Sequence, residues 1–166
     1  MVVRQYRAQD LPRIIEIFEC SVSAACGDYS PEQLSAWKSA DFSGWHARFE
    51  NSLTLVAEEG GAVLAFGNIL QCAENSGLSC GKRQLRAGDG YLDMLYTAPG
   101  FMRRGAAAKI CDCLEPAVKG DIYADVSKTA LPFFAARGYS VITPQTVVRR
   151  GVEIQNFAVV LRRSRA

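Results

Sequence analysis

Residues 91–110, YLDMLYTAPGFMRRGAAAKI, combine residue types that could bind a phosphate. An apolar run that is typical of a strand ends at Thr97, and Pro99-Gly100 interrupts it. Two arginines, a glycine and a run of alanines then open an amphipathic helix. The first turn of a helix carries unpaired backbone N–H groups at the positive end of its dipole, and small side chains leave them accessible to an anion. The segment therefore predicts a site for a phosphorylated ligand.

Strand and helix patterns surround this segment. Apolar runs between turn residues predict strands, and apolar residues at helical spacing behind a capping residue predict helices. Asp10, Ser30 and Ser127 are candidate N-caps, and Glu59-Gly60-Gly61 is a candidate hairpin turn. The expected strands are 2–7, 53–57, 62–70, 91–97, 121–126, 141–142, 146–148 and 153–161, and the expected helices are 11–22, 31–37, 43–49, 103–118 and 128–137.

The order of these elements predicts the fold class. Helices between strands imply crossovers and hairpins imply antiparallel pairs, so we expect an α/β (α+β) protein with a mixed, mostly antiparallel sheet of six to seven strands flanked by helices. No repeat or linker interrupts the pattern, and residues 1–166 are expected to form a single domain. Pro116 should weaken or end the helix at 103–118, and residues 72–90 read as a long connection.

The composition excludes several classes of function. A formal net charge of +2 is too small to indicate binding to nucleic acid or to a membrane. No apolar run is long enough to span a bilayer, and the polar start MVVRQYRAQD does not resemble a secretory signal. We therefore expect a cytoplasmic protein.

The cysteines and the single histidine do not predict a metal site. The six cysteines include no C-x-x-C pair, and His46 stands apart from them. Cys20, Cys111 and Cys113 fall in apolar helical patterns and are expected to be buried thiols. Cys72 and Cys80 could bridge the long connection, although a reducing compartment favours free thiols.

Two sequence blocks resemble the GNAT superfamily of acetyltransferases. Its signature, Gln/Arg-x-x-Gly-x-Gly/Ala at a strand-to-helix junction, compares with Met-Arg-Arg-Gly-Ala-Ala at 102–107, where Met102 replaces the leading Gln or Arg. A second block, SKTALPFF at 127–134 followed by Gly138-Tyr139, resembles the Asn/Ser, Ala, aromatic-pair and Gly-aromatic pattern of many members. The start of the chain, from Val3-Arg4 to Asp10, also resembles the opening of many members, and the YSPEQLSAW segment at 29–37 resembles a bacterial subgroup of uncharacterised members.

The resemblance implies a GNAT-like fold with acetyl-CoA as co-substrate. In that family, amides of the turn bind the CoA pyrophosphate, the central strand offers backbone groups to the pantetheine arm, and the later helix lines the thiol end. Ser127 could reach the pantetheine arm or be a plain N-cap, and the two phenylalanines could instead be core. The implied cofactor-binding residues are Leu95, Tyr96, Thr97, Met102, Arg103, Arg104, Gly105, Ala106, Ala107, Ala108, Ser127, Ala130, Phe133 and Phe134.

Acetyl transfer to an amine requires proton removal from the amine, polarisation of the thioester oxygen and protonation of the departing thiolate. Asp93, the acidic residue of the central strand, is either the base or a hydrogen-bonded structural carboxylate. The position where many members have a tyrosine as general acid is Phe134 here. Tyr139 is the candidate replacement, with Tyr96, Tyr29 or water as alternatives.

The leading hypothesis is therefore an N-acetyltransferase that moves an acetyl group from acetyl-CoA to a primary amine of a small molecule or peptide. A non-catalytic acyl-CoA-binding module or sensor is the alternative, since Phe134 removes the usual acid. A P-loop or dinucleotide-binding protein is disfavoured because neither glycine-rich motif is present. No metal is implied, the expected partner is the amine acceptor, and the protein could be a monomer or a homodimer.

Overall fold

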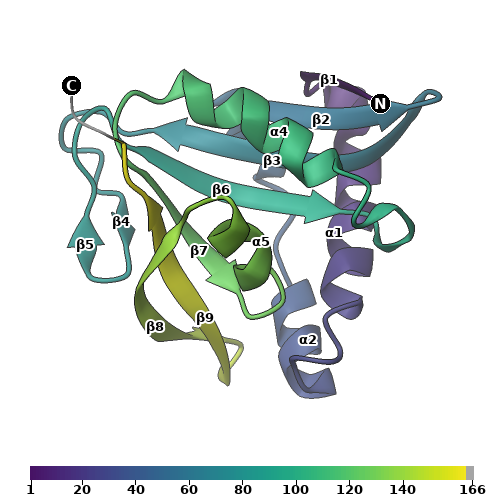
Figure 1. The fold of residues 1–166 in the computed structure, drawn as a ribbon. Coiled ribbons are helices and arrows are strands. Elements are labelled where there is room, and N and C mark those ends of the chain that lie inside the picture. The colour runs from purple at the N-terminus through teal and green to yellow at the C-terminus, as the bar shows by residue number, and fades with distance from the viewer. Residues whose placement is uncertain (164–166) are drawn as a thin grey trace. The chain divides into compact units, whose positions relative to one another are not determined.

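The computed structural model describes residues 1–163. Its main strands follow the order β1-β2-β3-β6-β7-β9-β8 in a seven-stranded sheet, and β4 and β5 form a separate hairpin. Figure 1 shows the strands and the helices that flank them, which confirms the predicted fold class. The strands are β1 (Val2–Gln5), β2 (Leu53–Glu59), β3 (Ala62–Gln71), β4 (Ser79–Cys80), β5 (Arg83–Gln84), β6 (Gly90–Thr97), β7 (Ile122–Ser127), β8 (Ser140–Arg149) and β9 (Val152–Leu161).

Three of the five predicted helices are shorter in the structure, and the other two are each one residue longer. The chain folds into two compact units, the first comprising Met1–Ile69 with Met94–Ala117 and the second Leu70–Asp93 with the residues from Val118 onward. The α-helices are α1 (Leu11–Ser23), α2 (Pro31–Lys38), α3 (Trp45–Glu50), α4 (Ala106–Leu114) and α5 (Leu131–Ala136), and short 3-10 helices cover Ala8–Asp10, Pro99–Phe101 and Glu115–Ala117.

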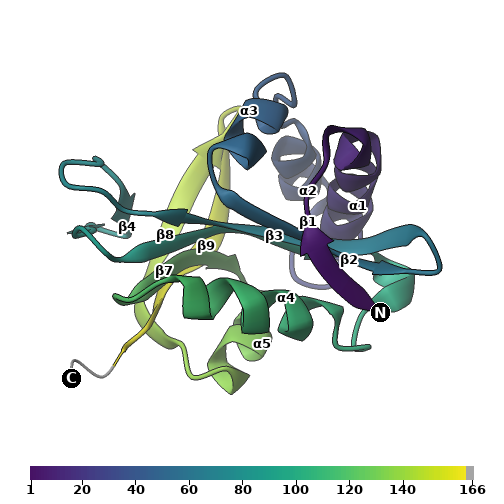
Figure 2. The same cartoon turned by 90° about the horizontal axis from the view of Figure 1, so that it is seen from above.

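The first unit contains the antiparallel strands β1, β2 and β3. Gly60 and Gly61 have φ values of +59° and +81°, which suits the tight turn predicted between β2 and β3. Helices α1, α2 and α3 lie on one side of this sheet and α4 on the other (Figure 2). The core on the α1 side is an aromatic cluster in which rings meet mostly edge to face, and its members are Phe18, Phe42, Trp45, Phe49, Phe66 and Tyr96.

Two helix starts in the first unit differ in how they are capped. The Ser30 Oγ accepts from the Gln33 N–H at 3.2 Å, and the Gln33 side chain accepts from the Ser30 N–H, so the predicted cap of α2 is confirmed. Asp10 does not cap α1 in the predicted way. A 3-10 turn precedes the helix, and the Asp10 carboxylate accepts from the Arg7 N–H and the Arg4 guanidinium instead.

Two predictions about buried cysteines are wrong. Cys20 and Cys113 are exposed, whereas Cys111 is buried as expected. The buried face of α4 consists of Ala106, Ile110, Cys111 and Leu114, and Cys113 lies at the edge of this face, where its side chain is exposed. The helix ends at Leu114, before Pro116, as the proline predicts.

The second unit contains the start of β6 with β7, β9 and β8. Strand β6 pairs with β7 in parallel, and β7–β9 and β9–β8 are antiparallel. Arg150 and Gly151, with φ values of +48° and +77°, form the turn between β8 and β9, and β8 is one continuous strand where two were predicted.

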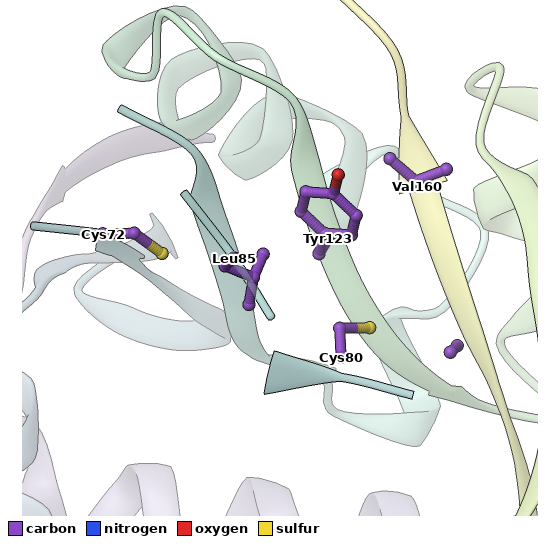
Figure 3. Packing of buried hydrophobic residues seen from close by; sticks show 6 residues of the cluster. Cys72, Cys80, Leu85, Tyr123 and Val160 are labelled. Atoms are coloured by element: carbon purple, nitrogen blue, oxygen red, sulfur yellow. The ribbon is translucent and has the colours of Figure 1, made fainter. Parts of the chain in front are cut away.

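A small apolar core holds the predicted long connection in place. The β4–β5 hairpin, which the sequence did not predict, lies within that connection and carries Cys80 at its turn. Figure 3 shows Leu85 and Cys80 packed beside Tyr123 of β7 and Val160 of β9. All six cysteines are free, so Cys72 and Cys80 do not form a disulfide.

Candidate active site

The central strand β6 carries the first group of predicted site residues. Its end is fixed inside the first unit, because the Ser21 hydroxyl donates to the Thr97 carbonyl at 2.7 Å and the Ala98 N–H donates to the Leu64 carbonyl at 2.8 Å. The Tyr96 ring stacks on Phe66, with the ring centroids 5.6 Å apart. The Tyr96 side chain is therefore part of the aromatic core, which leaves a backbone role for this residue.

The turn after β6 has the backbone shape of an anion-binding nest. Arg103 and Gly105 have positive φ values of +60° and +83°. Such left-handed residues turn successive N–H groups toward one side of the chain. A Cβ atom at Gly105 would meet no heavy atom within 4 Å, so the space beside the turn is open. Gly105 could be selected from the sequence as part of the site, but nothing in the sequence indicated that Arg103 also has a left-handed backbone conformation.

Helix α4 begins at this turn without a side-chain cap. Its N-cap is Gly105, and its first helical hydrogen bond runs from the Lys109 N–H to the Gly105 carbonyl at 3.0 Å. The N–H groups of Ala106, Ala107 and Ala108 precede that bond and have no acceptor in the helix. They lie at the positive end of the helix dipole, where an anion is stabilised.

Two arginines bring positive charge to the turn. The Arg104 guanidinium contacts the Glu59 carboxylate at 3.2 Å and lies 5.2 Å from the centre of the Phe101 ring. Arg103 and Met102 are exposed. Both arginines are exposed, and Arg104 is already partly neutralised by Glu59.

The second unit carries the residues of the second sequence block. The Ser127 Oγ accepts from the Ala130 N–H at 3.1 Å, so it caps the turn that leads into α5. The predicted helix at 128–137 therefore begins three residues later, at Leu131. This contact is local and does not involve the Ser127 backbone N–H.

The aromatic residues of this block pack on one another. Phe134 is buried between Phe133 and Tyr139, with centroid distances of 5.4 and 5.1 Å and nearly perpendicular rings. Phe133 is half-buried and lies under the Arg137 guanidinium at 5.9 Å. Tyr139, the candidate acid, is 5% exposed. The structure brings these three aromatic residues together, and it shows Phe134 filling a core position.

A second carboxylate, which the sequence analysis did not single out, lies on β7, the strand next to the one that carries Asp93. The parallel ladder between β6 and β7 includes the pairs Gly90–Ile122 and Tyr91–Tyr123, and Asp93 follows two residues later on β6. On β7, Asp125 accepts from the Tyr91 hydroxyl at 2.7 Å. In the sequence, Asp125 could have been noticed as the lone acidic residue within the otherwise mostly apolar strand IYADVS.

The carboxylates affect the acidity of Tyr91. Burial raises the pKa of Tyr91, and the charges of Asp125 and Asp93 raise it further, far above its ordinary value. Burial and the Asp125 charge likewise raise the pKa of the Cys80 thiol, to about 12. Both groups therefore keep their protons at neutral pH, and neither is suited to accept a proton from an amine.

Comparison with known proteins identifies the family. The model of the acetyltransferase (GNAT) domain matches residues 25–161, which is most of the chain. This chain belongs to the GNAT acetyltransferase family. A GNAT relative, the uncharacterized N-acetyltransferase YafP of Escherichia coli, is 30% identical over 158 residues, which cover 93% of this chain and 91% of the relative.

Solved GNAT structures share the fold. A GCN5-related N-acetyltransferase from Rhodopseudomonas palustris superposes with a TM-score of 0.81 at 28% identity and covers 97% of this chain and 94% of its own. The PaiA N-acetyltransferase from Thermoplasma acidophilum, solved in complex with coenzyme A, has a TM-score of 0.72 at 16% identity, with 98% of both chains covered. The resemblance to this superfamily inferred from the two sequence blocks is thus confirmed.

Two further features concern possible metal ligands and membrane-spanning helices. Within residues 1–163, no three histidine, cysteine or acidic side chains are grouped so that they could hold a metal ion. None of the helices in that part of the chain is both long and apolar enough to cross a membrane.

Proposed function

We propose that residues 1–166 act as one catalytic domain that transfers an acetyl group from acetyl-CoA to a primary amine of a small molecule or peptide. The observation that carries this proposal is the uncapped start of α4 behind the left-handed pair Arg103 and Gly105. The N–H groups at this helix start and the open space beside Gly105 fit a pyrophosphate. Membership of the GNAT family makes the CoA pyrophosphate the fitting anion.

The groups of the turn would hold the nucleotide end of the co-substrate. The amides of residues 103–108 would donate to the phosphate oxygens, and the exposed Arg103 would add a charge-assisted contact. Met102, at the start of the turn, would contact the ligand through its thioether chain, since its side chain is 46% exposed. Bound acetyl-CoA would supply an activated acetyl thioester; the protein supplies position and proton transfer.

The remaining proposed contacts follow the strand and α5. Backbone groups of Leu95, Tyr96 and Thr97 would pair with the pantetheine arm, although the Thr97 carbonyl already accepts from Ser21. From the second unit, Ser127 and Ala130 would contact the same arm. Phe133 and Phe134 would line the thiol end. These assignments are supported by the matching family pattern at the two blocks.

Asp93 is the proposed base. Its carboxylate would take a proton from the acceptor ammonium, after which the amine nitrogen bonds to the thioester carbonyl carbon, releases a second proton to solvent, and the carbon–sulfur bond breaks. Tyr139 is the proposed donor of a proton to the departing thiolate. Because its side chain is only 5% exposed, which limits its contact with a ligand, solvent is the competing proton donor. The products are an N-acetyl amine and the CoA thiol.

The test of this proposal is a matched pair of substitutions at Gly105. Asn and Asp have the same shape and both tolerate a positive φ, so Gly105→Asn and Gly105→Asp differ only in charge. We expect CoA affinity, measured by calorimetry, to be at least about tenfold weaker for Gly105→Asp than for Gly105→Asn, because a carboxylate repels the pyrophosphate. Equal affinities would contradict the site.

The sensor alternative is favoured by one observation, the buried phenylalanine at position 134 in place of the usual acid. Thiol release from acetyl-CoA, followed over a panel of amines, separates the two functions. Turnover with any amine supports the enzyme, whereas firm CoA binding without turnover supports the sensor.

A further inference from the structure

Three polar side chains form a row across one face of the second unit, and the acetyl-transfer site above does not use them. They are Asp125 on β7, Asn156 on β9 and Gln145 on β8, and all three are half-buried. Register places Asn156 opposite both Ser127 and Gln145. The Gln145 side chain reaches back to Asp125, so the three side chains share a face of the sheet. We call these residues the Asp125 row.

The carboxylate of Asp125 is held in a fixed orientation. The Tyr91 hydroxyl donates to Oδ2 at 2.7 Å, and the Gln145 Nε2 donates to Oδ1 at 2.6 Å. The Cys80 thiol contacts Oδ1 at 3.4 Å. An ionised carboxylate has about four lone-pair positions, so the one bond to Oδ2 leaves room for a further donor. Asp125 is thus an oriented anion with remaining capacity to accept.

Asn156 provides a second acceptor in the same row. Within residues 1–163 no donor hydrogen-bonds to the Asn156 Oδ1, although this atom is buried. A buried acceptor without a donor costs free energy, and most such groups in folded proteins are paired. A ligand with N–H or O–H groups would supply the missing donor.

The surroundings of the row separate it from the apolar core. Figure 3 shows the apolar cluster of Cys72, Leu85, Tyr123 and Val160 on the β4–β5 side, and Cys80 marks its border. On the face of β7 that Cys80 contacts, the side chains change from apolar to polar at Asp125. The row therefore presents acceptors, and one negative charge, next to an apolar wall.

We propose that the Asp125 row is an acceptor-binding subsite that selects amines carrying a second, positively charged N–H donor. This inference rests on the proposed function and adds the class of acceptor. The second cationic group of the acceptor lies against the Asp125 carboxylate and donates to the Asn156 Oδ1, while the reacting amine lies elsewhere. An acceptor with a carboxylate in that place is rejected by repulsion from Asp125.

The test uses four amines of equal chain length that differ only at the far end. The far end is a methyl in pentylamine, a hydroxyl in aminopentanol, a carboxylate in aminopentanoate and an ammonium in diaminopentane. We expect kcat/KM, from thiol release, to fall in the order ammonium, hydroxyl, methyl, carboxylate. Equal values for ammonium and methyl, or a preference for the carboxylate, would overturn the proposal.

Two variants assign the preference to the row. Asp125→Asn keeps the shape of the side chain and removes its charge, so the ratio of kcat/KM for diaminopentane to that for pentylamine should fall about tenfold. Asn156→Asp should raise this ratio. Gln155→Glu, one residue away on the opposite face of β9, adds the same charge to the protein and should not change it.

A fold defect would lower the rate for all four amines without changing their order, so the ratio separates selection from folding. If the ratio of kcat/KM for diaminopentane to that for pentylamine is unchanged in Asp125→Asn, the proposal is wrong. Thiol release from none of the amines would contradict the proposed function. In that case, calorimetric titration of the amines tests the Asp125 row. We expect diaminopentane to bind more tightly than pentylamine, and this difference in affinity should shrink in Asp125→Asn. Equal affinities of the two amines for the wild type would overturn the proposal.

Discussion

At the scale of single residues, backbone conformation matters as much as side-chain chemistry in the proposed CoA site. Gly105 and Arg103 both lie in the left-handed region, but only glycine adopts it without strain. Arg103 is therefore a strained residue next to a helix start, a combination that is found at functional sites. The arginine side chain and its backbone N–H can serve the same anion.

The role of Asp93 is tested by the variant Asp93→Asn. If the carboxylate is the base, we expect turnover at neutral pH to fall about a hundredfold, within the range for loss of one acid–base group. CoA affinity should not change. The measurement is thiol release at saturating acetyl-CoA, together with calorimetric titration of CoA. Glu74→Gln, which removes an exposed carboxylate of the same unit, is the matched control, and a rate equal to that of the control would rule Asp93 out as base.

Asp10 is a buried carboxylate with a role in stability. Burial alone would raise its pKa, but hydrogen bonds from Arg4 and from the Arg7 N–H outweigh this, and the pKa of Asp10 is lowered from 3.8. A lowered pKa means that the ionised form stabilises the folded state. This contribution is complete above pH 3.8 and is lost as the pH falls through the folded-state pKa.

We therefore expect Asp10→Asn to reduce the free energy of unfolding by about 2 kcal/mol at pH 7. The difference from the wild type should narrow only below pH 3.8. Urea unfolding at several pH values measures both effects. Glu16→Gln, which breaks an exposed ion pair with Arg13, should cost less than about 1 kcal/mol. A difference that stays constant down to pH 2 would contradict the assigned charge.

At the scale of elements, close packing around one glycine fixes α4 against its sheet. A Cβ atom at Gly67 of β3 would lie 2.9 Å from a Leu95 methyl, 3.1 Å from an Ile110 methyl and 3.1 Å from the Met94 carbonyl. The contact with Leu95 is shorter than real Cβ atoms show, and the other two are tighter than most, so the glycine sets how near β6 and α4 come to β3. Helix α4 carries the proposed phosphate turn, and its position therefore depends on a residue without a side chain.

Gly67→Ala tests this packing. We expect a loss of about 1–3 kcal/mol in the free energy of unfolding, because neighbouring atoms must move to admit the methyl group. CoA affinity should fall as well, since α4 is displaced. Gly27→Ala is the control, because a Cβ at Gly27 meets no atom within 4 Å. Equal stabilities of the two variants, measured by urea unfolding, would show that the sheet adapts freely.

At the scale of the whole molecule, the chain places the proposed site residues in both compact units. The first unit contains the phosphate turn, and the second contains Asp93, Ser127 and Phe134. Strand β6 belongs to both units, since its residues through Asp93 fall in the second and those from Met94 in the first. Binding of CoA at the proposed phosphate turn should stabilise the first unit, which contains that turn.

Thermal unfolding tests this expectation. Free CoA at about a hundred times its Kd should add about 2.7 kcal/mol of stability. For a chain of 166 residues, this is a rise in Tm of roughly 5–10 °C. ATP and NAD should give no comparable shift at the same concentration. A larger shift with either of these than with CoA would favour the dinucleotide-binding alternative.

Much of the architecture could be predicted because its signals are local. The cap at Ser30, the glycine turn at Gly60, the end of α4 near Pro116 and the turn at Gly105 before α4 each depend on residues a few positions apart. The buried cysteines were harder to assign, because Cys111 and Cys113 have similar neighbours in sequence and differ only in which side of α4 faces the sheet.

By itself the sequence determined the fold class and the family, because turn residues and hydrophobic periods act over short stretches of chain; the phosphate site at Gly105 stays a prediction. Only the tertiary structure revealed Asp125, which is joined to Tyr91 and Gln145 by hydrogen bonds across 34 and 20 residues of sequence. It also gave Arg103 its left-handed backbone and Asn156 its buried, unpaired oxygen. Such features arise from strand pairing and packing between distant segments, which no local pattern encodes.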